Sequence, residues 1–90
     1  MSETPASSPW VVYILRCHGG SLYTGITTDP DRRLRQHNAG TAARYTRSHL
    51  PVTMVYREDQ PTRGDALRRE AAIKKLARTA KLRLIAGFAG

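Results

Sequence analysis

The chain has 90 residues, with 15 lysines and arginines against seven acids and one cysteine, which gives a formal net charge of +8. A chain of this length supports one hydrophobic core, so we expect a single domain over residues 10–86, with a short tail at 87–90. The lone cysteine excludes an internal disulfide and a zinc site of clustered thiolates, and it suits a reducing cytoplasm. No apolar run is long enough to cross a membrane, and the polar residues 1–9 predict a flexible tail rather than a signal peptide.

The positive charge is concentrated toward the C-terminus. Residues 61–90 contain eight bases and two acids, a net charge of +6, which leaves +2 for the first sixty residues. A basic surface attracts nucleic acid and contacts its phosphates without regard to sequence. A solvated helix surface that keeps a small protein soluble explains the same composition. Because the charge is gathered in one part of the chain, we favour a nucleic-acid partner, with ribosomal and membrane-surface roles open.

The first half of the chain predicts a hairpin. Residues 10–17 and 22–27 are rich in β-branched and aromatic side chains, and residues 18–21 between them are typical of a turn. Two antiparallel strands are therefore expected.

A helix is expected after the hairpin. Asp29 is a favourable N-cap residue, and Pro30 fits the first helical position. Asn38 and Gly40 are both good terminators. Residues 39–51 lack apolar periodicity and predict a loop.

The second half predicts a strand and two helices. A third strand is expected over residues 52–57. The longest helical stretch follows Pro61, and its apolar stripe has steps of four, three and four residues at Ala66, Glu70, Ile73 and Ala77. Thr79 is expected to cap a last helix over residues 80–86. The order β-β-α-β-α-α predicts an α+β fold in which a small three-stranded antiparallel sheet is flanked by helices.

Two tyrosine motifs, a basic helix and an isolated acid follow one another along the chain. Tyr13 and Tyr23 precede Arg33, and Glu70 comes much later among apolar helix residues. Metal-assisted phosphodiester cleavage needs a proton acceptor, a cation for the phosphate and an oxygen ligand for a hard divalent ion. Hydroxyl, guanidinium and carboxylate groups supply these functions. The sequence therefore favours a small nuclease.

These residues resemble the GIY-YIG nuclease superfamily, specifically its small stand-alone bacterial branch with a single catalytic-type domain. Val11-Val12-Tyr13 stands where the family has Gly-Ile-Tyr, and Tyr23-Thr24-Gly25 stands where it has Tyr-Ile-Gly. Arg33 and Glu70 match the arginine and the metal-binding glutamate of the family. The match runs from Trp10 to about Ile85. Val11 in place of the first glycine and Thr24 in place of the central isoleucine remove no reacting group.

The resemblance implies hydrolysis of a phosphodiester with one divalent metal ion, Mg²⁺ or Mn²⁺. Tyr13 would lie near the attacking water as general base, and Tyr23 would also lie at the phosphate. Arg33 would stabilise the transition state, and a metal on Glu70 would neutralise the leaving oxygen. His37 lies four residues after Arg33 on the same helical face and is a further catalytic candidate.

The two tyrosines can share a site only in one strand register. Side chains alternate between the faces of a strand, so a two- or four-residue turn from Cys17 to Leu22 would place Tyr13 and Tyr23 on opposite faces. An odd-length loop or a bulge would bring Tyr13, Leu15 and Tyr23 to one face. We predict the odd register.

Each candidate also has a purely structural interpretation. The following alternatives stay open: Tyr13 and Tyr23 as half-buried strand aromatics, Arg33 as a surface cation or partner of Asp29, His37 as a helix-end residue, and Glu70 in a buried ion pair with Arg33 or Arg69. Cys17 is expected in the core. His18 and His49 show no ligand spacing for zinc.

Several cations are candidates for binding the nucleic-acid backbone: Arg44, Arg47, Lys74, Lys75 and Arg78. Tyr45, between the first two, could stack on a base, although an ordinary polar loop would have the same residues.

Two classes of function remain from the sequence. The first is a divalent-metal-dependent DNA endonuclease acting in repair or recombination on branched, damaged or single-stranded DNA, and a monomer is favoured over an oligomer. The second is a non-catalytic nucleic-acid-binding module of the same fold, and a protein-interaction domain is a weaker third. A pure binder has no need of a carboxylate beside a phosphate, so the set favours the enzyme. RNA stays open as the polymer.

Overall fold

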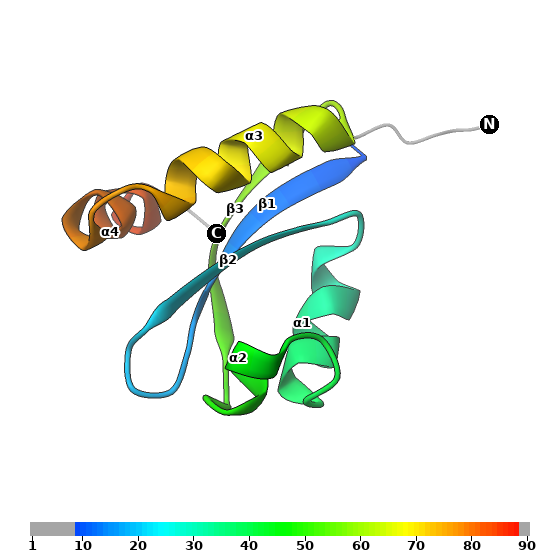
Figure 1. The fold of residues 1–90 in the computed structure, drawn as a ribbon, viewed down its shortest axis with the longest axis vertical. Helices are drawn as coiled ribbons and strands as arrows, with labels where there is room; N and C mark the ends of the chain where they lie inside the picture. Colours follow the sequence, from blue (N-terminus) through cyan, green and yellow to red (C-terminus); the bar gives the residue numbers. More distant parts are fainter. Residues whose placement is uncertain (1–8, 89–90) are drawn as a thin grey trace.

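The first strand of the chain is the centre of the sheet. The computed structural model describes residues 9–88, and its elements in chain order are β1 (Trp10–Arg16), β2 (Leu22–Thr27), α1 (Pro30–Asn38), α2 (Arg44–Arg47), β3 (Thr53–Gln60), α3 (Arg63–Lys74) and α4 (Arg78–Ala86). The sheet order is β2-β1-β3, and both neighbours run antiparallel to β1. Helices α1 and α2 lie on one face of the sheet, and α3 lies along the other (Figure 1). The predicted α+β fold is confirmed.

The register of the hairpin agrees with the prediction. A five-residue loop joins Arg16 to Leu22, and Leu15 lies opposite Tyr23 while Tyr13 lies opposite Gly25. Side chains directly opposite one another share a face of the sheet, so Tyr13, Leu15 and Tyr23 project to the same side. The loop can turn because Gly19 and Gly20, which follow each other in it, both have positive φ angles, of 93° and 95°.

Two small cores form because β1 is covered on both faces. Val12 and Ile14 are fully buried against Ala66 and Ile73 of α3. On the other face the buried cluster comprises Tyr13, Leu15, Cys17 and Val52, with Leu34 of α1 packed against it. A central strand covered on both faces reads as a continuous apolar run, which is the pattern of residues 11–15. Cys17 is a free, buried thiol, as expected of a core residue.

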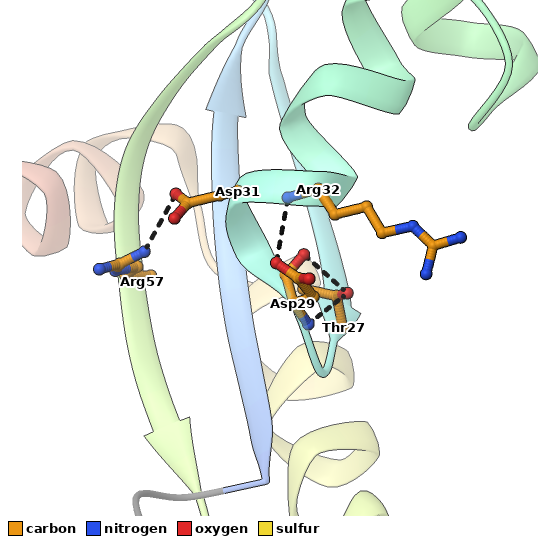
Figure 2. A network of polar contacts seen from close by, with 5 residues as sticks. All are labelled: Thr27, Asp29, Asp31, Arg32 and Arg57. Carbon is orange, nitrogen blue, oxygen red and sulfur yellow. Dashed lines mark hydrogen bonds and ion pairs between the residues drawn. The ribbon is translucent and has the colours of Figure 1, made fainter.

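The start of α1 is fixed by local polar contacts. The Asp29 carboxylate accepts a hydrogen bond from the Arg32 backbone N–H at 3.1 Å, and the Asp29 backbone N–H donates to Thr27 Oγ1 at 3.1 Å. Asp31 forms a 3.9 Å ion pair with Arg57 of β3. Figure 2 shows this network, with the Arg32 side chain extending away from the sheet. The predicted N-cap at Asp29 and the helix end at Asn38 are confirmed.

Two expectations about element boundaries in the middle of the chain were wrong. The predicted loop 39–51 contains α2, which has no side-chain cap and is too short to show a periodicity. Strand β3 extends to Gln60 because its polar end pairs with Trp10 and Val11 of β1, and this pairing outweighs low strand propensity.

The C-terminal helix also differs from the prediction. Its N-cap residue is Ala77, which makes no side-chain cap hydrogen bond, and Thr79 lies within the first turn. Ala77 is exposed and does not continue the buried stripe of Ala66 and Ile73. Within residues 9–88, no helix has the length and apolar character needed to cross a membrane.

The predicted tails fall largely outside the described residues. Residues 1–8 and 89–90 are not described, so the expectation of a flexible N-terminal segment stays a prediction.

Candidate active site

The Tyr13 side chain lies across the backbone of Gly25. A Cβ atom at Gly25 would stand 2.5 Å from the Tyr13 hydroxyl oxygen and 2.7 Å from its Cζ atom. Real Cβ atoms do not approach other atoms so closely. Strand β2 is at the edge of the sheet, so this glycine lets the phenol reach over the edge strand. The glycine of the second motif therefore leaves the space that the tyrosine side chain of the first motif occupies.

A chain of hydrogen bonds connects Tyr13 to α1 and α2. The Tyr13 hydroxyl is 2.9 Å from His37 Nε2, and His37 Nδ1 is 2.8 Å from Thr46 Oγ1. The Thr46 hydroxyl donates its only proton to the Ala43 carbonyl oxygen at 3.2 Å. With that proton engaged by Ala43, we assign Thr46 Oγ1 as the acceptor from His37 Nδ1–H; in this tautomer Nε2 carries no proton and accepts from Tyr13. All three side chains in this chain of hydrogen bonds are buried.

Tyr23 completes the aromatic part of the cluster. Its ring contacts the His37 ring edge to face, with centroids 5.3 Å apart, and the Tyr13 ring contacts the same imidazole at 5.8 Å. His37 therefore lies against both tyrosines of the two motifs. The structure brings together three of the four residues that the sequence proposed as catalytic.

Burial and neighbouring charges determine the protonation of this cluster. Burial raises the pKa of Tyr13 well above its ordinary value; the electrostatic influence of Tyr23 and of the Glu70 carboxylate acts in the same direction, and Arg33 opposes them. Burial and Arg33 lower the pKa of His37. At neutral pH the phenol is thus protonated and the imidazole neutral, which fits the direction of the hydrogen bond between them.

Arg33 lies at the edge of a polar pocket next to the cluster. The pocket has a volume of about 270 Å³ and is lined by Thr27, Thr28, Asp29, Arg32, Arg33 and Gln36. Arg33 acts electrostatically on both Tyr13 and His37. The pocket therefore offers several hydrogen-bonding side chains and a cation whose charge reaches the tyrosine hydroxyl. Within residues 9–88, Arg33 makes no ion pair with Asp29, whose carboxylate caps α1 instead.

Glu70 approaches the cluster from the helix on the opposite face. Helix α3 packs against β1 and β2, and the Glu70 side chain is 19% exposed. Its Oε2 atom forms a 3.3 Å ion pair with Lys74, and its charge acts on Tyr13. Within the described residues Glu70 pairs with Lys74 and not with Arg33 or Arg69, so the alternative of a pair with either arginine was wrong; Arg69 binds Glu58 at 2.8 Å.

The donor set for a metal is small. No group of three histidine, cysteine, aspartate or glutamate side chains that could hold a metal occurs within residues 9–88. Mg²⁺ does not require such a cage, because it commonly binds one or two carboxylates and completes its shell with water and substrate phosphate oxygens. Glu70 fits that role, since within the described residues only one of its carboxylate oxygens has an ion-pair partner.

The proposed backbone-binding cations fall into two groups. Arg44 and Arg47 belong to α2, beside α1, whereas Lys74 and Lys75 end α3 on the other side of the sheet. Arg78 begins α4 and donates a 3.0 Å hydrogen bond to the carbonyl oxygen of Gly20 in the β1–β2 loop. Lys74 is engaged by Glu70.

Sequence reasoning missed Thr46. It lies in the segment that was expected to be an irregular loop, and a threonine there carries no signal of its contact with His37 nine residues earlier. His37 was proposed only for its helical spacing from Arg33. Its burial and its bond to Tyr13 follow from the tertiary fold.

Comparison with known proteins agrees with this architecture. A family model described as the GIY-YIG catalytic domain matches residues 9–83. The chain therefore belongs to the GIY-YIG family, whose catalytic domain is of the nuclease type and generally uses a divalent metal. The resemblance found in the two tyrosine motifs is confirmed.

Two relatives of this chain are UPF0213 proteins, which the chain matches over most of their length. A UPF0213 protein of Streptococcus sanguinis is 51% identical over 74 residues, which cover 82% of this chain and 85% of the relative. A UPF0213 protein of Desulfotalea psychrophila is 52% identical over 77 residues, covering 84% and 70%.

Two solution NMR structures share the fold. A UPF0213 protein from Bacillus halodurans has 43% identity and a TM-score of 0.56, with 86% of this chain and 82% of the other covered. A protein from E. faecalis has 45% identity and a TM-score of 0.57, with 91% and 85% covered.

Proposed function

We propose that this protein is a divalent-metal-dependent endonuclease that hydrolyses DNA phosphodiester bonds in repair or recombination. The observation that carries the proposal is the hydrogen bond from the Tyr13 hydroxyl to His37 Nε2, with Arg33 and Glu70 acting on the same hydroxyl. A structural tyrosine needs a packing space and one polar partner. Here the phenol is hydrogen-bonded to a neutral base and is influenced electrostatically by a cation and a carboxylate, a combination suited to acid–base chemistry at a phosphate.

The proton path runs inward from the attacking water. The water gives its proton to the Tyr13 oxygen as the water oxygen bonds to phosphorus, and the Tyr13 proton moves to His37 Nε2. The phenol is thus regenerated and the imidazole becomes cationic, with Nδ1–H still bound to Thr46. This path resolves the difficulty of a buried tyrosine with a raised pKa, because no free phenolate has to exist before the reaction. Tyr23 packs against His37 and fixes the ring plane.

Charge on the phosphate is balanced from two sides. Arg33 in the polar pocket binds the non-bridging oxygens and stabilises the added negative charge of the transition state. Glu70 would hold a divalent cation, Mg²⁺ or Mn²⁺, which when bound acts as a Lewis acid toward the leaving oxygen. Lys74 neutralises Glu70 in the absence of that cation.

The proposed partner and location of the protein rest on its charge and its single thiol. The net charge of +8 favours a polyanionic partner, and we propose DNA rather than RNA. Arg44, Arg47, Lys75 and Arg78 contact the backbone on either side of the site. We propose a monomer that acts in the cytoplasm, where the thiol of Cys17 stays reduced.

Cleavage of supercoiled, single-stranded and branched DNA with Mg²⁺ or Mn²⁺ tests the proposal. Glu70→Gln should abolish metal-dependent cleavage, whereas Asp59→Asn removes an exposed carboxylate from β3 with the same change in net charge and should cleave normally. Tyr13→Phe should lower the rate at least about 100-fold, because it breaks the proton path. Normal cleavage by Glu70→Gln would contradict the assignment of the carboxylate.

The non-catalytic binding module is the second candidate. The ion pair between Glu70 and Lys74 favours it, because that pair removes the repulsion between the carboxylate and a phosphate without any metal. Binding of every DNA substrate with no cleavage in either metal would support this module and overturn the nuclease. In that case Glu70→Gln would leave the affinity nearly unchanged.

A further inference from the structure

Aromatic rings continue outward from the candidate site to the surface. Tyr23, which touches His37, is nearly parallel to Tyr45, with an interplanar angle of 12° and centroids 6.4 Å apart. Tyr45 stacks in turn on His49, at 17° and 4.2 Å. The Tyr45 ring is 44% exposed, one of three large apolar side chains that reach the surface within residues 9–88. The ring series therefore starts at the tyrosine cluster and ends in solvent.

The outer rings are held in place by hydrogen bonds. The Tyr45 hydroxyl donates to Ser21 Oγ at 2.7 Å, across to the β1–β2 loop. His49 Nδ1 lies 2.7 Å from the Tyr45 carbonyl oxygen and donates to it. These bonds fix the ring planes before any ligand arrives, so stacking on them loses little conformational entropy. A tyrosine that only filled space would be buried, and this one is not.

Cations surround the exposed rings. Arg44 and Arg47 flank Tyr45 on α2, both are exposed, and neither is paired with an acid within the described part of the chain. Together with residues 40–43 they line an open pocket of about 480 Å³. Arg78 is bound to the carbonyl oxygen of Gly20, the neighbour of the Ser21 that accepts the hydrogen bond from Tyr45. A flat aromatic surface with arginines close by is complementary to a base and its neighbouring phosphates.

We propose that the Tyr45–His49 stack is a binding site for an unpaired nucleobase of single-stranded DNA. A base within a duplex is covered on both faces by its neighbours, so an unpaired base is the one that can stack at the outer, His49 end of this ring series, against the exposed Tyr45 and the half-buried His49. Arg44 and Arg47 hold the phosphates on either side of that base. The substrate class, DNA with a single-stranded segment next to the cleaved bond, rests on the proposed nuclease function, whereas the binding site itself does not.

A binding measurement without cleavage tests the stacking site separately from the nuclease function. Fluorescence anisotropy is measured in a metal-chelating buffer with two labelled probes, a single strand of about 12 nucleotides and the blunt-ended duplex of the same strand with its full complement. Tyr45→Leu should weaken binding of the single strand about 5- to 100-fold and change binding of the duplex less than about twofold. Tyr45→Phe keeps the ring and loses only the bond to Ser21, so it should bind the single strand nearly as well as the native protein.

A second variant and a spectroscopic signal make the test decisive. His49→Leu should produce the same selective loss, and thermal unfolding shows that each variant is folded. A strand containing 2-aminopurine should lose fluorescence on binding to the native protein, because stacking on an aromatic ring quenches this base, and Tyr45→Leu should abolish the quenching. An equal loss of affinity for both probes, or no loss with either variant, would overturn the stacking site. Absence of cleavage with the affinity pattern intact would overturn only the nuclease.

Discussion

The hydroxyl oxygen of Tyr13 is the atom on which the candidate site depends. It lies over Gly25, bonds to His37, and is influenced by the charges of Arg33 and Glu70. These residues come from β1, β2, α1 and α3, so the site exists only when both faces of the sheet are assembled. Its position above the edge strand is what allows α3, on the far face, to act on it.

Gly25→Ala tests the position of that phenol. The new methyl group would displace the Tyr13 ring from the backbone of β2, and overpacking of this kind costs about 1–3 kcal/mol of folding free energy. Cleavage should fall about as far as with Tyr13→Phe. Urea unfolding and a cleavage assay provide the measurements. Gly64→Ala is the control: its Cβ would meet nothing closer than 3.6 Å and it lies in α3, so stability should stay the same or rise. Full activity of Gly25→Ala would show that the ring has another place to go.

Residue-level prediction succeeded where spacing determined geometry. The odd register followed from the need to place Tyr13 and Tyr23 on one face, and the structure has that register. The partner of Glu70 was not predictable, because an ion pair four residues along a helix and one across the fold have similar sequence signatures. Stacking of Tyr45 on His49 likewise depends on a turn of helix that gives no periodic signal.

At the scale of elements, the short helix α2 is the main addition to the predicted fold. It is only four residues long, it lacks a capping side chain, and it is held to α1 by the buried contact between Thr46 and His37. Its two outer positions carry Arg44 and Arg47, and its second carries Tyr45. By contrast, β1, β2 and α1 were predictable because strand composition, turn glycines and the Asp29 cap all favoured the same boundaries. One small element thus supports the base of the site and forms its proposed outer surface.

Thr46→Val tests whether α2 orients His37. Valine keeps the shape of threonine but leaves the His37 Nδ1–H without an acceptor, which should cost about 1–3 kcal/mol of stability and favour the other tautomer. With the proton on Nε2, the imidazole cannot accept from Tyr13, and cleavage should drop about 10- to 100-fold. The ¹⁵N chemical shifts of the imidazole report the tautomer directly. Thr46→Ser retains the hydroxyl and should retain the native tautomer. An unchanged tautomer in the valine variant would remove Thr46 from the proton path.

At the scale of the whole molecule, one buried and one half-buried ionisable group make stability depend on pH in separate windows. The pKa of His37 is lowered by burial and by Arg33, so the folded protein binds this proton less readily than the unfolded chain does. Although burial alone would raise the pKa of Glu58, its hydrogen bonds from Arg69, Tyr56 and Gln60 lower it overall. Protonation of either group therefore destabilises the folded protein as the pH falls, but the two losses begin at different pH values.

The free energy of unfolding should decline below about pH 6.5, where an unfolded histidine takes up its proton, with a slope of up to about 1.4 kcal/mol per pH unit until the folded pKa is reached. Protonation of His37 would place a positive charge near Arg33 and break the hydrogen bond that Nε2 accepts from Tyr13. The other ring against the imidazole, Tyr23, has no carboxylate that could neutralise this charge. A second decline should begin near pH 4.5 from Glu58. Urea unfolding across this pH range should show that His37→Gln removes the upper decline, whereas Glu58→Gln removes only the lower one. If His37→Gln kept the upper decline, the neutral buried imidazole on which the proton path depends would be excluded.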